Sequence, residues 1–539
     1  MILLQLIIIK NMTYFSHKLK PAGKTATQAT TYMAAKGKNV RDLPQLLTPD
    51  FCQINENYIP LTDGGLAKRK GLIKIAEIAG NKAGTMIAEW KGYFIFGYDK
   101  TVAALNISTL AVTTIKSNWT TNDPFSGGSY GDFFFVGNLG DKVHYITETA
   151  GVFTITEIAG APKSGVIRPI GPRLYAGVEN AVYYCSIDDG TDPPFQTWTV
   201  ATTATAGGKV SFRNAGTITE ICSLGDIIVA FGDTGKWAFR ITTQNDGTGT
   251  IVKLDEVVID RVDMGGASGA KTTPKGLFYV NSTGLWQVIS LGQPNIPFSD
   301  QEGLTSVLLG TKYWDDVDLT NCDMVYHAKF NTLLVTCAKA SISNNHIVTY
   351  NTENKAFATF KNWNINRFTK IDGDIYGISS VKTAIYHCLA GSDDDGITIG
   401  TEYKQELKTG DLETRQSIFG EYIQGDLHSL SNIKVNFDIY NVRGVLELNK
   451  IKLEWTPTAN YNTLDGFGTA EYGKSGFGGD DDQSGLVSSF AGARAYIRNY
   501  QRIILHIKSS DKFPHSLNWV KMDTQVKGKI RNRQLTQII

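Results

Sequence analysis

The 539-residue sequence lacks an excess of charge of either sign and lacks any long hydrophobic run. Its 53 basic and 52 acidic residues leave a net charge of +1, which excludes a free-standing DNA or membrane binder held by bulk charge. The apolar opening, MILLQLIIIK, is far shorter than the ~20 residues that span a bilayer. It also has neither a basic leader nor a cleavage site, so we expect no signal peptide and no membrane-spanning segment.

Cysteine is scarce and shows no metal-binding spacing. The six cysteines contain no CxxC pair and lie mostly in apolar runs, so they are interpreted as reduced core thiols of a protein assembled in a cytoplasm. The eight histidines never form HExxH, and His144, His327 and His387 are expected in strands. The acidic turns lack the DxDxDG order of a calcium loop and are interpreted as solvated. They are Asp188-Asp189, Asp393-Asp394-Asp395 and Asp480-Asp481-Asp482. We therefore predict no metal and no cofactor.

Helical periodicity is nearly absent. With 54 glycines, 11% aromatic residues and abundant Thr, Val and Ile, the composition favours strands joined by turns. A single helix is expected, near ATQATTYMAAKGK at 26–38. The sequence thus predicts an all-β protein.

One unit recurs along the chain: a turn with Gly or Asn, an aromatic or branched strand, a second turn and another strand. Its spacing of 39 to 55 residues is close to the ~40–50 residues of a four-stranded propeller blade. We therefore predict an irregular β-propeller of about six to seven blades, with stacked β-sandwiches as the alternative. The seven leading turns lie at Gly92, Gly131, Gly171, Gly225, Gly276, Asn331 and Gly373.

Beyond about residue 396 the strands become longer and alternate apolar with polar residues, as in two-sided antiparallel sheets. The predicted organisation is an N-terminal arm over 1–40, the propeller over 41–395 and a β-platform over 396–539. Within the platform, residues 460–485 are rich in Gly and Asp and are predicted to form a long exposed loop.

Two catalytic motifs occur outside the context they require. GTAEYGKS at 468–475 matches the phosphate-loop pattern, but it lies in the Gly/Asp-rich loop and GFGGDDD follows it, which opposes the required helix. GGSYG at 127–131 matches the nucleophile elbow, but DFFFVG continues as strand. We therefore predict that the chain is not an enzyme.

One enzymatic alternative remains at SIDDGTDPPFQTW, which begins like the Asp-box turn of propeller sialidases at Ser186. Its tryptophan comes five positions late and no other blade repeats it. A glycan-active or glycan-binding propeller, sialidase-like or a depolymerase, also needs two carboxylates that converge on a sugar. The glycan-active or glycan-binding propeller is kept as the alternative function. A further interpretation is a monomeric bacterial scaffold propeller.

Several stretches resemble the tail nozzle proteins of short-tailed bacteriophages. The segment RDLPQLLTPDFCQINENYIPLTDGGLAKRKGLIKI is similar to the opening of that family, with Gly65, the basic pair Lys68-Arg69 and Gly71. Three further stretches agree in order along residues 40 to 530: YYCSIDDGTDPPFQTW, KGLFYVNSTGLWQVISLGQPNIPFSDQEG, and EYGKSGFGGDDD followed by ARAYIRNYQRIILHIKSSDKFPHSLNWVKMD. Lys70 departs from the family, where proline commonly follows the basic pair.

The resemblance implies a propeller with a β-platform, six copies forming a homohexameric ring below the head-to-tail adaptor in the virion tail. It implies retention of packaged double-stranded DNA, its conduction on ejection, contacts with tail fibre or spike proteins, and no catalysis. From Gly485 to the C-terminus the chain carries ten Lys/Arg and two Asp, which fits either a solvated surface or a rim that faces a partner or DNA. The candidate subunit or adaptor contacts are Lys68, Arg69, Phe467, Tyr472, Phe477, Arg494, Arg498, Arg502 and Lys521.

Overall fold

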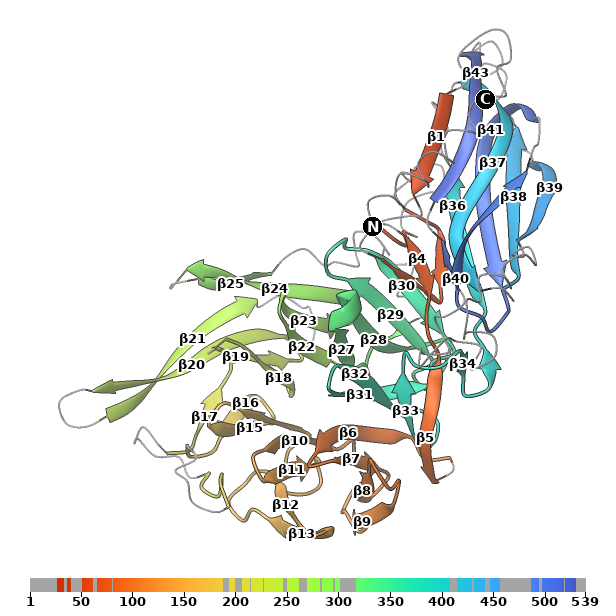
Figure 1. The fold of residues 1–539 in the computed structure, drawn as a ribbon. Helices are drawn as coiled ribbons and strands as arrows, with labels where there is room; N and C mark the ends of the chain where they lie inside the picture. Colours follow the sequence, from red (N-terminus) through yellow and green to blue (C-terminus); the bar gives the residue numbers. More distant parts are fainter. Residues whose placement is uncertain are drawn as a thin grey trace, which may run out of the picture.

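The fold is all-β, as the composition predicts (Figure 1). In the computed structural model, the described residues form strands β1 to β43, and their helical content is one 3₁₀ turn, η2 (Ala328–Phe330). The residues that the structure describes are 27–32, 36–39, 51–61, 65–79, 81–187, 193–198, 206–213, 215–225, 227–245, 250–260, 269–281, 284–293, 296–300, 317–407, 414–428, 431–441, 446–455, 486–493, 497–517 and 519–529.

Seven antiparallel four-stranded units follow one another along the chain. The first three are β6 (Gly84–Trp90), β7 (Tyr93–Tyr98), β8 (Thr101–Asn106) and β9 (Val112–Lys116); β10 (Ser126–Tyr130), β11 (Phe133–Gly137), β12 (His144–Thr149) and β13 (Val152–Glu157); and β14 (Val166–Ile170), β15 (Arg173–Val178), β16 (Ala181–Tyr184) and β17 (Gly208–Ser211). The next two are β18 (Ile218–Leu224), β19 (Ile227–Gly232), β20 (Gly235–Asn245) and β21 (Thr250–Asp260); and β22 (Gly269–Thr273), β23 (Gly276–Asn281), β24 (Gly284–Gln293) and β25 (Ile296–Asp300).

The sixth and seventh units complete the ring. The sixth comprises β27 (Met324–His327), β28 (Thr332–Lys339), β29 (His346–Asn351) and β30 (Phe357–Lys361), with the short β26 (Val317–Asp318) beside β28. The seventh comprises β31 (Ile365–Ile371), β32 (Asp374–Ser379), β33 (Thr383–Cys388) and, from the start of the chain, β5 (Leu72–Ala79). The first strands contact in the order β6, β10, β14, β18, β22, β27, β31 and back to β6. The described units therefore form a seven-bladed propeller, closed by pairing β5 with β33.

Each predicted leading turn joins the first two strands of one blade. All seven residues have positive φ, from 49° at Asn331 to 126° at Gly276. Glycine adopts this conformation without a Cβ penalty, and asparagine tolerates it better than most residues do. This is why the turn residues were the clearest signal of blade repetition in the sequence.

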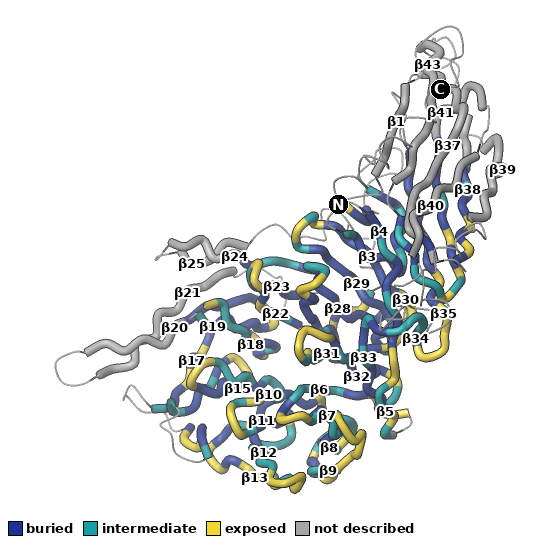
Figure 2. The backbone as a smooth tube through the Cα atoms, viewed as in Figure 1, coloured by how far each residue is buried: buried dark blue, intermediate teal, exposed yellow. Residues whose placement is uncertain are grey.

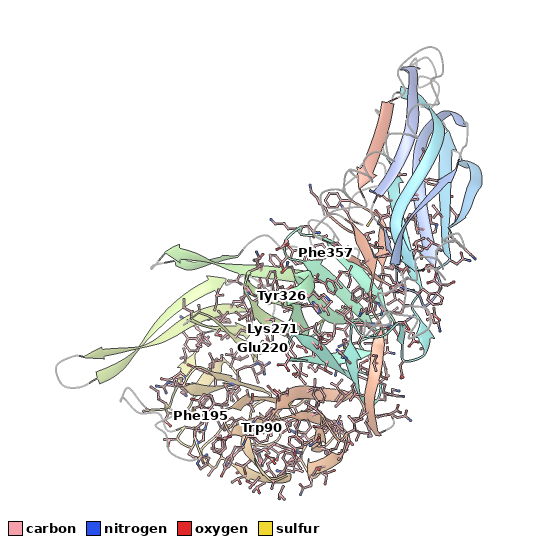
Figure 3. All side chains as sticks on the ribbon, in the orientation of Figure 1. Trp90, Phe195, Glu220, Lys271, Tyr326 and Phe357 are labelled. Atoms are coloured by element: carbon pink, nitrogen blue, oxygen red, sulfur yellow. The ribbon has the colours of Figure 1, made fainter. Side chains whose placement is uncertain are left out.

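Polar side chains connect neighbouring blades near the middle of the ring. Arg168 on β14 donates to Ser126 on β10 and to Glu220 on β18, each at 2.8 Å. Asn366 on β31 donates to the carbonyl oxygen of Gly84 on β6 at 2.6 Å, across the point where the ring closes. Figure 3 shows Glu220 near Lys271 in this region. The inner strands of neighbouring blades are therefore joined by side-chain hydrogen bonds as well as by the aromatic cores between the blades.

The platform is built from longer strands, as the sequence predicts. They are β36 (Thr401–Leu407), β37 (Thr414–His428), β38 (Ile433–Asn441), β39 (Leu446–Trp455), β40 (Leu486–Ala493), β41 (Ile497–Ser509) and β43 (Trp519–Lys529). Alternating residues of β38 and β41 form one buried cluster with Tyr403, and they are Ile433, Val435, Phe437, Ile503, Leu505 and Ile507. This alternation buries one face of the sheet.

The prediction of a helix at 26–38 is wrong for the residues of this range that the structure describes. Residues Thr27–Tyr32 form strand β1, which pairs antiparallel with β43 from Thr27↔Thr524 to Tyr32↔Trp519. The segment contains three threonines and a tyrosine, which favour strands, and an open edge of β43 supplies the hydrogen-bond partners. The tertiary pairing outweighs the local Ala-rich pattern that suggested a helix.

A continuous hydrogen-bonded sheet connects the propeller to the platform. Strand β2 (Ile54–Glu56) pairs parallel with β30 of the sixth blade and antiparallel with β36 of the platform. Beside it, β3 (Tyr58–Pro60), β4 (Leu66–Lys68) and β42 (Ser516–Leu517) form a small second sheet, and β34 (Asp393–Asp394) pairs with both β5 and β35 (Ile397–Thr398). Figure 2 shows that much of the described backbone at this junction is buried.

Candidate functional site

The junction between propeller and platform contains a buried, doubly hydrogen-bonded ion pair. Arg69, between β4 and β5, donates from Nη1 to Asp394 Oδ1 at 2.8 Å and from Nη2 to Asp394 Oδ2 at 2.6 Å. Both residues are buried, at 2% and 6% exposure. A two-point guanidinium–carboxylate pair fixes geometry as well as charge.

Neighbouring groups satisfy the remaining polar atoms of this pair. Arg69 Nε donates to Asn57 Oδ1 at 2.9 Å, and Asn57 Nδ2 donates to the Gly400 carbonyl oxygen at 2.6 Å. Trp363 Nε1 donates to Asp394 Oδ1 at 3.1 Å, and the Arg69 guanidinium lies 4.9 Å from the Trp363 ring centroid. These bonds offset part of the free-energy cost of burying the two charges.

The preceding residue, Lys68, makes a second link toward the platform. Its Nζ lies 3.5 Å from Asp511 Oδ1 and donates to the carbonyl oxygens of Asp511 and Phe513. Burial lowers the pKa of Lys68, and the Asp511 charge opposes that effect. The adjacent basic residues Lys68 and Arg69 thus bond in different directions, one to the platform and one to the strand after the seventh blade.

A buried tyrosine and histidine complete the junction. Tyr58 hydroxyl and His515 Nε2 are 3.0 Å apart, and Thr401 Oγ1 donates to the same hydroxyl at 3.0 Å. Burial lowers the pKa of His515 to about 3, with the Lys68 charge adding to the effect. His515 is therefore neutral at ordinary pH.

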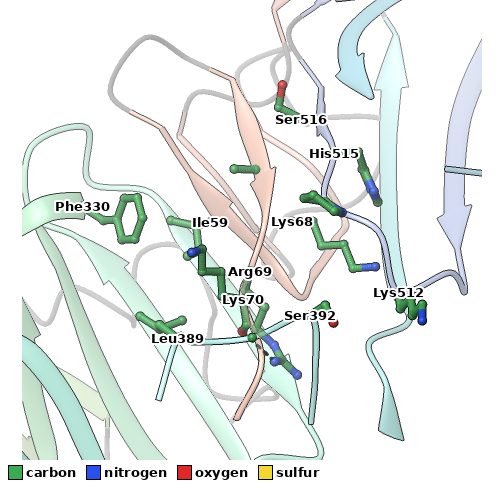
Figure 4. Close-up of a pocket in the computed structure, with 13 residues that line it drawn as sticks. Ile59, Lys68, Arg69, Lys70, Phe330, Leu389, Ser392, Lys512, His515 and Ser516 are labelled. Atoms are coloured by element: carbon green, nitrogen blue, oxygen red, sulfur yellow. Dashed lines mark hydrogen bonds between the residues drawn. The ribbon is translucent and has the colours of Figure 1, made fainter. Parts of the chain in front are cut away.

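A small cleft opens beside these residues (Figure 4). Its volume is about 140 Å³, and both parts of the chain contribute to its walls. Among the described residues that line it, the side chains are either apolar or basic, apart from His515 and two serines, and none is acidic. They include Ile59, Phe330, Leu389, Pro514, Lys68, Arg69, Lys70 and Lys512.

Burial sets the protonation state of two cysteine thiols, and aromatic rings pack against three histidines. Burial raises the pKa of the thiols of Cys52 and Cys337 to about 12, so these cysteines stay protonated. His144, His327 and His387 lie in strands against aromatic rings, as predicted. The described residues contain no group of three or more His, Cys, Asp or Glu placed to hold a metal ion. In the same residues, no helix has the length and apolarity to cross a membrane.

The predicted contact residues fall into three groups. Lys68 and Arg69 are buried, and their charged groups bond within the chain instead of facing a partner. Arg498 and Arg502 lie on β41 opposite Ser417 and Tyr440, and Lys521 lies on β43 between Thr30 and Tyr422. Their role as partner contacts stays a prediction. Outside the described residues lie Phe467, Tyr472, Phe477 and Arg494, together with the 460–485 loop and its GTAEYGKS motif.

Sequence reasoning missed the residues that complete the junction. The turn Asp393-Asp394-Asp395 was expected to be solvated, and for Asp394 this is wrong because Arg69 and Trp363 bind its carboxylate in the interior. Asp511 and His515 were not predicted either. The available signal was the adjacent pair Lys68-Arg69 between two apolar strands, since buried cations require nearby acids.

Comparison with known proteins gives no family. No known protein-family model matches this chain, and no curated protein is significantly similar to it. Among solved structures, it is similar to a computationally designed protein, Ika8, with 9% identity and a TM-score of 0.36, over 59% of this chain and 99% of that one. A likeness this distant bears on neither family nor function.

The buried histidines predict acid sensitivity. Burial holds the pKa of His515 and of His346 at about 3, whereas an unfolded histidine titrates near about 6.5. Between these values the unfolded chain binds more protons, so stability falls as the pH drops through that window. From pH 7.5 to 5 we expect a loss on the order of 2 kcal/mol per histidine, measured by urea unfolding. The variant His515→Gln/His346→Gln should show a flatter profile, and an identical profile would contradict the assignment.

Proposed function

We propose that this chain is a structural tail nozzle protein of a short-tailed bacteriophage. In this proposal six copies form a ring in the virion tail, below the head-to-tail adaptor. The ring retains packaged DNA and conducts it during ejection, without catalysis. The observation that carries the proposal is the hydrogen-bonded connection of propeller and platform through β30, β2 and β36, with the buried Arg69–Asp394 pair beside it.

Such a junction suits a part that must resist force. Backbone hydrogen bonds cross from one part to the other in one sheet, so separating the parts requires breaking several bonds together. The Arg69–Asp394 and Lys68–Asp511 pairs add charged contacts that are shielded from salt. A protein that holds DNA under pressure needs its two parts fixed relative to each other.

The overall charge is compatible with passage of DNA. Every phosphate that a basic residue neutralises releases counterions and adds to affinity. A strongly basic lumen would therefore hold the duplex in place, whereas a net charge of +1 on 539 residues does not. In a six-membered ring each contact joins two different faces of neighbouring subunits. Arg498, Arg502 and Lys521 on the platform strands are proposed for such contacts or for contacts with the adaptor.

Native mass measurement of the purified chain, alone and mixed with an adaptor complex, tests the proposal. We expect a particle of six times the 59.1 kDa chain mass, with assembly promoted by the adaptor. A chain that stays monomeric under both conditions would support the scaffold interpretation. Hydrolysis of a host polysaccharide by the same preparation would support the glycan-active alternative. Tail fibre or spike proteins, which are further proposed partners, can be added in the native mass measurement.

A further inference from the structure

A lysine and an uncharged histidine connect the first two blades of the propeller. Lys116 ends β9 of the first blade, and its Nζ lies 2.9 Å from Nε2 of His144, which begins β12 of the second blade. The other ring nitrogen of His144, Nδ1, lies 2.8 Å from the carbonyl oxygen of Lys142. A carbonyl oxygen only accepts, so Nδ1 carries the ring proton and Nε2 offers its lone pair to the ammonium group. The contact therefore requires a histidine without charge.

A buried tryptophan packs against both members of this pair. The ring centroid of Trp119 lies 4.4 Å from Lys116 Nζ and 4.7 Å from the ring centroid of His144. Trp119 and His144 are 2% and 4% exposed, so the contact is shielded from solvent. An ammonium group is attracted to the face of an indole ring, which holds Lys116 between the two rings. The environment of Trp119 therefore depends on where the ammonium group lies.

We propose that the Lys116–His144 contact is an acid-sensitive latch between the first and second blades. When Nε2 of His144 takes up a proton from solvent, it has no lone pair left to accept from Lys116. Two positive charges then face each other across the present 2.9 Å, and their repulsion drives them apart. Glu157, directly opposite His144 in the register of β12 and β13, attracts the protonated ring. The latch therefore opens as His144 exchanges Lys116 for Glu157.

The groups that face His144 set the pH at which the latch opens. Burial lowers the pKa of His144, and the charge of Lys116 adds to that effect. The hydrogen bond with the Lys142 carbonyl and the charges of Glu157 and Asp141 oppose it. The net shift of the pKa is downward from the ordinary 6.5, so the neutral ring is favoured at neutral pH. The latch is therefore closed at neutral pH and is lost as the pH falls through the lowered pKa.

Opening of the latch loosens the end of β9 without detaching the chain that follows it. Residues 117–125 connect β9 to β10, and separate contacts hold them in place. Asp141 accepts from the backbone nitrogen and the hydroxyl of Thr120, each at 2.8 Å, and Lys100 donates to the Thr120 carbonyl oxygen at 3.0 Å. None of these three bonds involves His144. The expected change is therefore local to Lys116 and the ring of Trp119.

Fluorine NMR of the full-length protein labelled with 5-fluorotryptophan tests the proposal. The chain has nine tryptophans, and comparison with Trp119→Phe identifies the Trp119 resonance. On titration from about pH 8 to about pH 4.5, we expect this resonance to shift with one midpoint below about 6.5, while the other resonances show that the chain stays folded. His144→Gln keeps an acceptor for Lys116 but does not titrate, so the shift should be absent. The same shift in His144→Gln would overturn the proposal.

Charge variants predict midpoint changes of opposite sign. Lys116→Met removes the neighbouring cation and should raise the midpoint by about one pH unit, whereas Glu157→Gln removes an attractive charge and should lower it. Lys82→Met is the matched control, because it changes an exposed lysine of the same blade that pairs with Asp99, and it should leave the midpoint unchanged. A midpoint in Lys116→Met that equals the one in Lys82→Met, or lies below it, would overturn the latch. None of these readouts depends on ring formation.

Discussion

Replacing Asp394 by asparagine is expected to destabilise the protein by about 3–5 kcal/mol, because it leaves the Arg69 guanidinium buried and uncompensated. Asparagine keeps the size of the side chain and an acceptor for Trp363 Nε1, but it presents an amide NH₂ where Arg69 Nη2 now meets Oδ2 at 2.6 Å. The measurement is the free energy of unfolding in urea, followed by tryptophan fluorescence. Trp363, fully buried beside the pair, is one of the nine tryptophans that contribute to this signal.

Two further variants separate burial from charge in this prediction. Arg69→Met/Asp394→Asn removes both charges and should be more stable than Asp394→Asn alone. Glu77→Gln removes an exposed carboxylate that pairs with Lys74 and Lys382, and should change stability by no more than about 1 kcal/mol. A loss of less than about 1 kcal/mol in Asp394→Asn would contradict the role given to the pair.

Gly71→Ala is expected to cost about 3 kcal/mol, at the upper end of the usual range for overpacking. A Cβ at this position would lie 1.7 Å from the carbonyl oxygen of Asp393 and 2.3 Å from its carbonyl carbon. The obstacle is backbone, so no side-chain rotation relieves the clash. Gly71 also exchanges backbone hydrogen bonds with Gly391 and Ala390, directly before the closing strand β5. The substitution therefore forces apart the segments that close the propeller.

Gly400→Ala is the matched control for this substitution. Gly400 lies at the same junction, but a Cβ there would meet its nearest neighbour, the Ser509 carbonyl oxygen, at 3.8 Å, an ordinary contact. We expect its unfolding midpoint to stay close to that of the parent protein. Equal effects of Gly71→Ala and Gly400→Ala in urea unfolding would show that close backbone approach is not what requires glycine at position 71.

The blade repeat could be predicted because its signal is local. A hairpin turn needs positive φ at a particular residue, and Gly92, Gly131 and Asn331 meet that need within a few positions of an aromatic strand. The all-β class and the change to longer strands beyond the propeller followed from the same local patterns. The number of blades was left at six to seven because the units are irregularly spaced, 39 to 55 residues apart. The closure itself could not be predicted, because the seventh blade takes its fourth strand from Leu72–Ala79, about 300 residues earlier in the sequence.

The junction could not be predicted because its partners are distant in sequence. Arg69 and Asp394 are 325 residues apart, and Tyr58 and His515 are 457 apart. A single sequence identifies a basic pair but cannot show which acids approach it, so Lys68 and Arg69 were assigned to an external partner. The erroneous helix at 26–38 has a similar cause, since only the fold shows that β43 offers an open edge to Thr27–Tyr32.

Electron microscopy of negatively stained, purified full-length protein tests the central claim most directly. We expect class averages of a closed ring of six subunits with a passage through its centre, formed alone or on adding the adaptor complex. Single propeller-and-platform particles under both conditions, with no ring at any protein concentration, would contradict it.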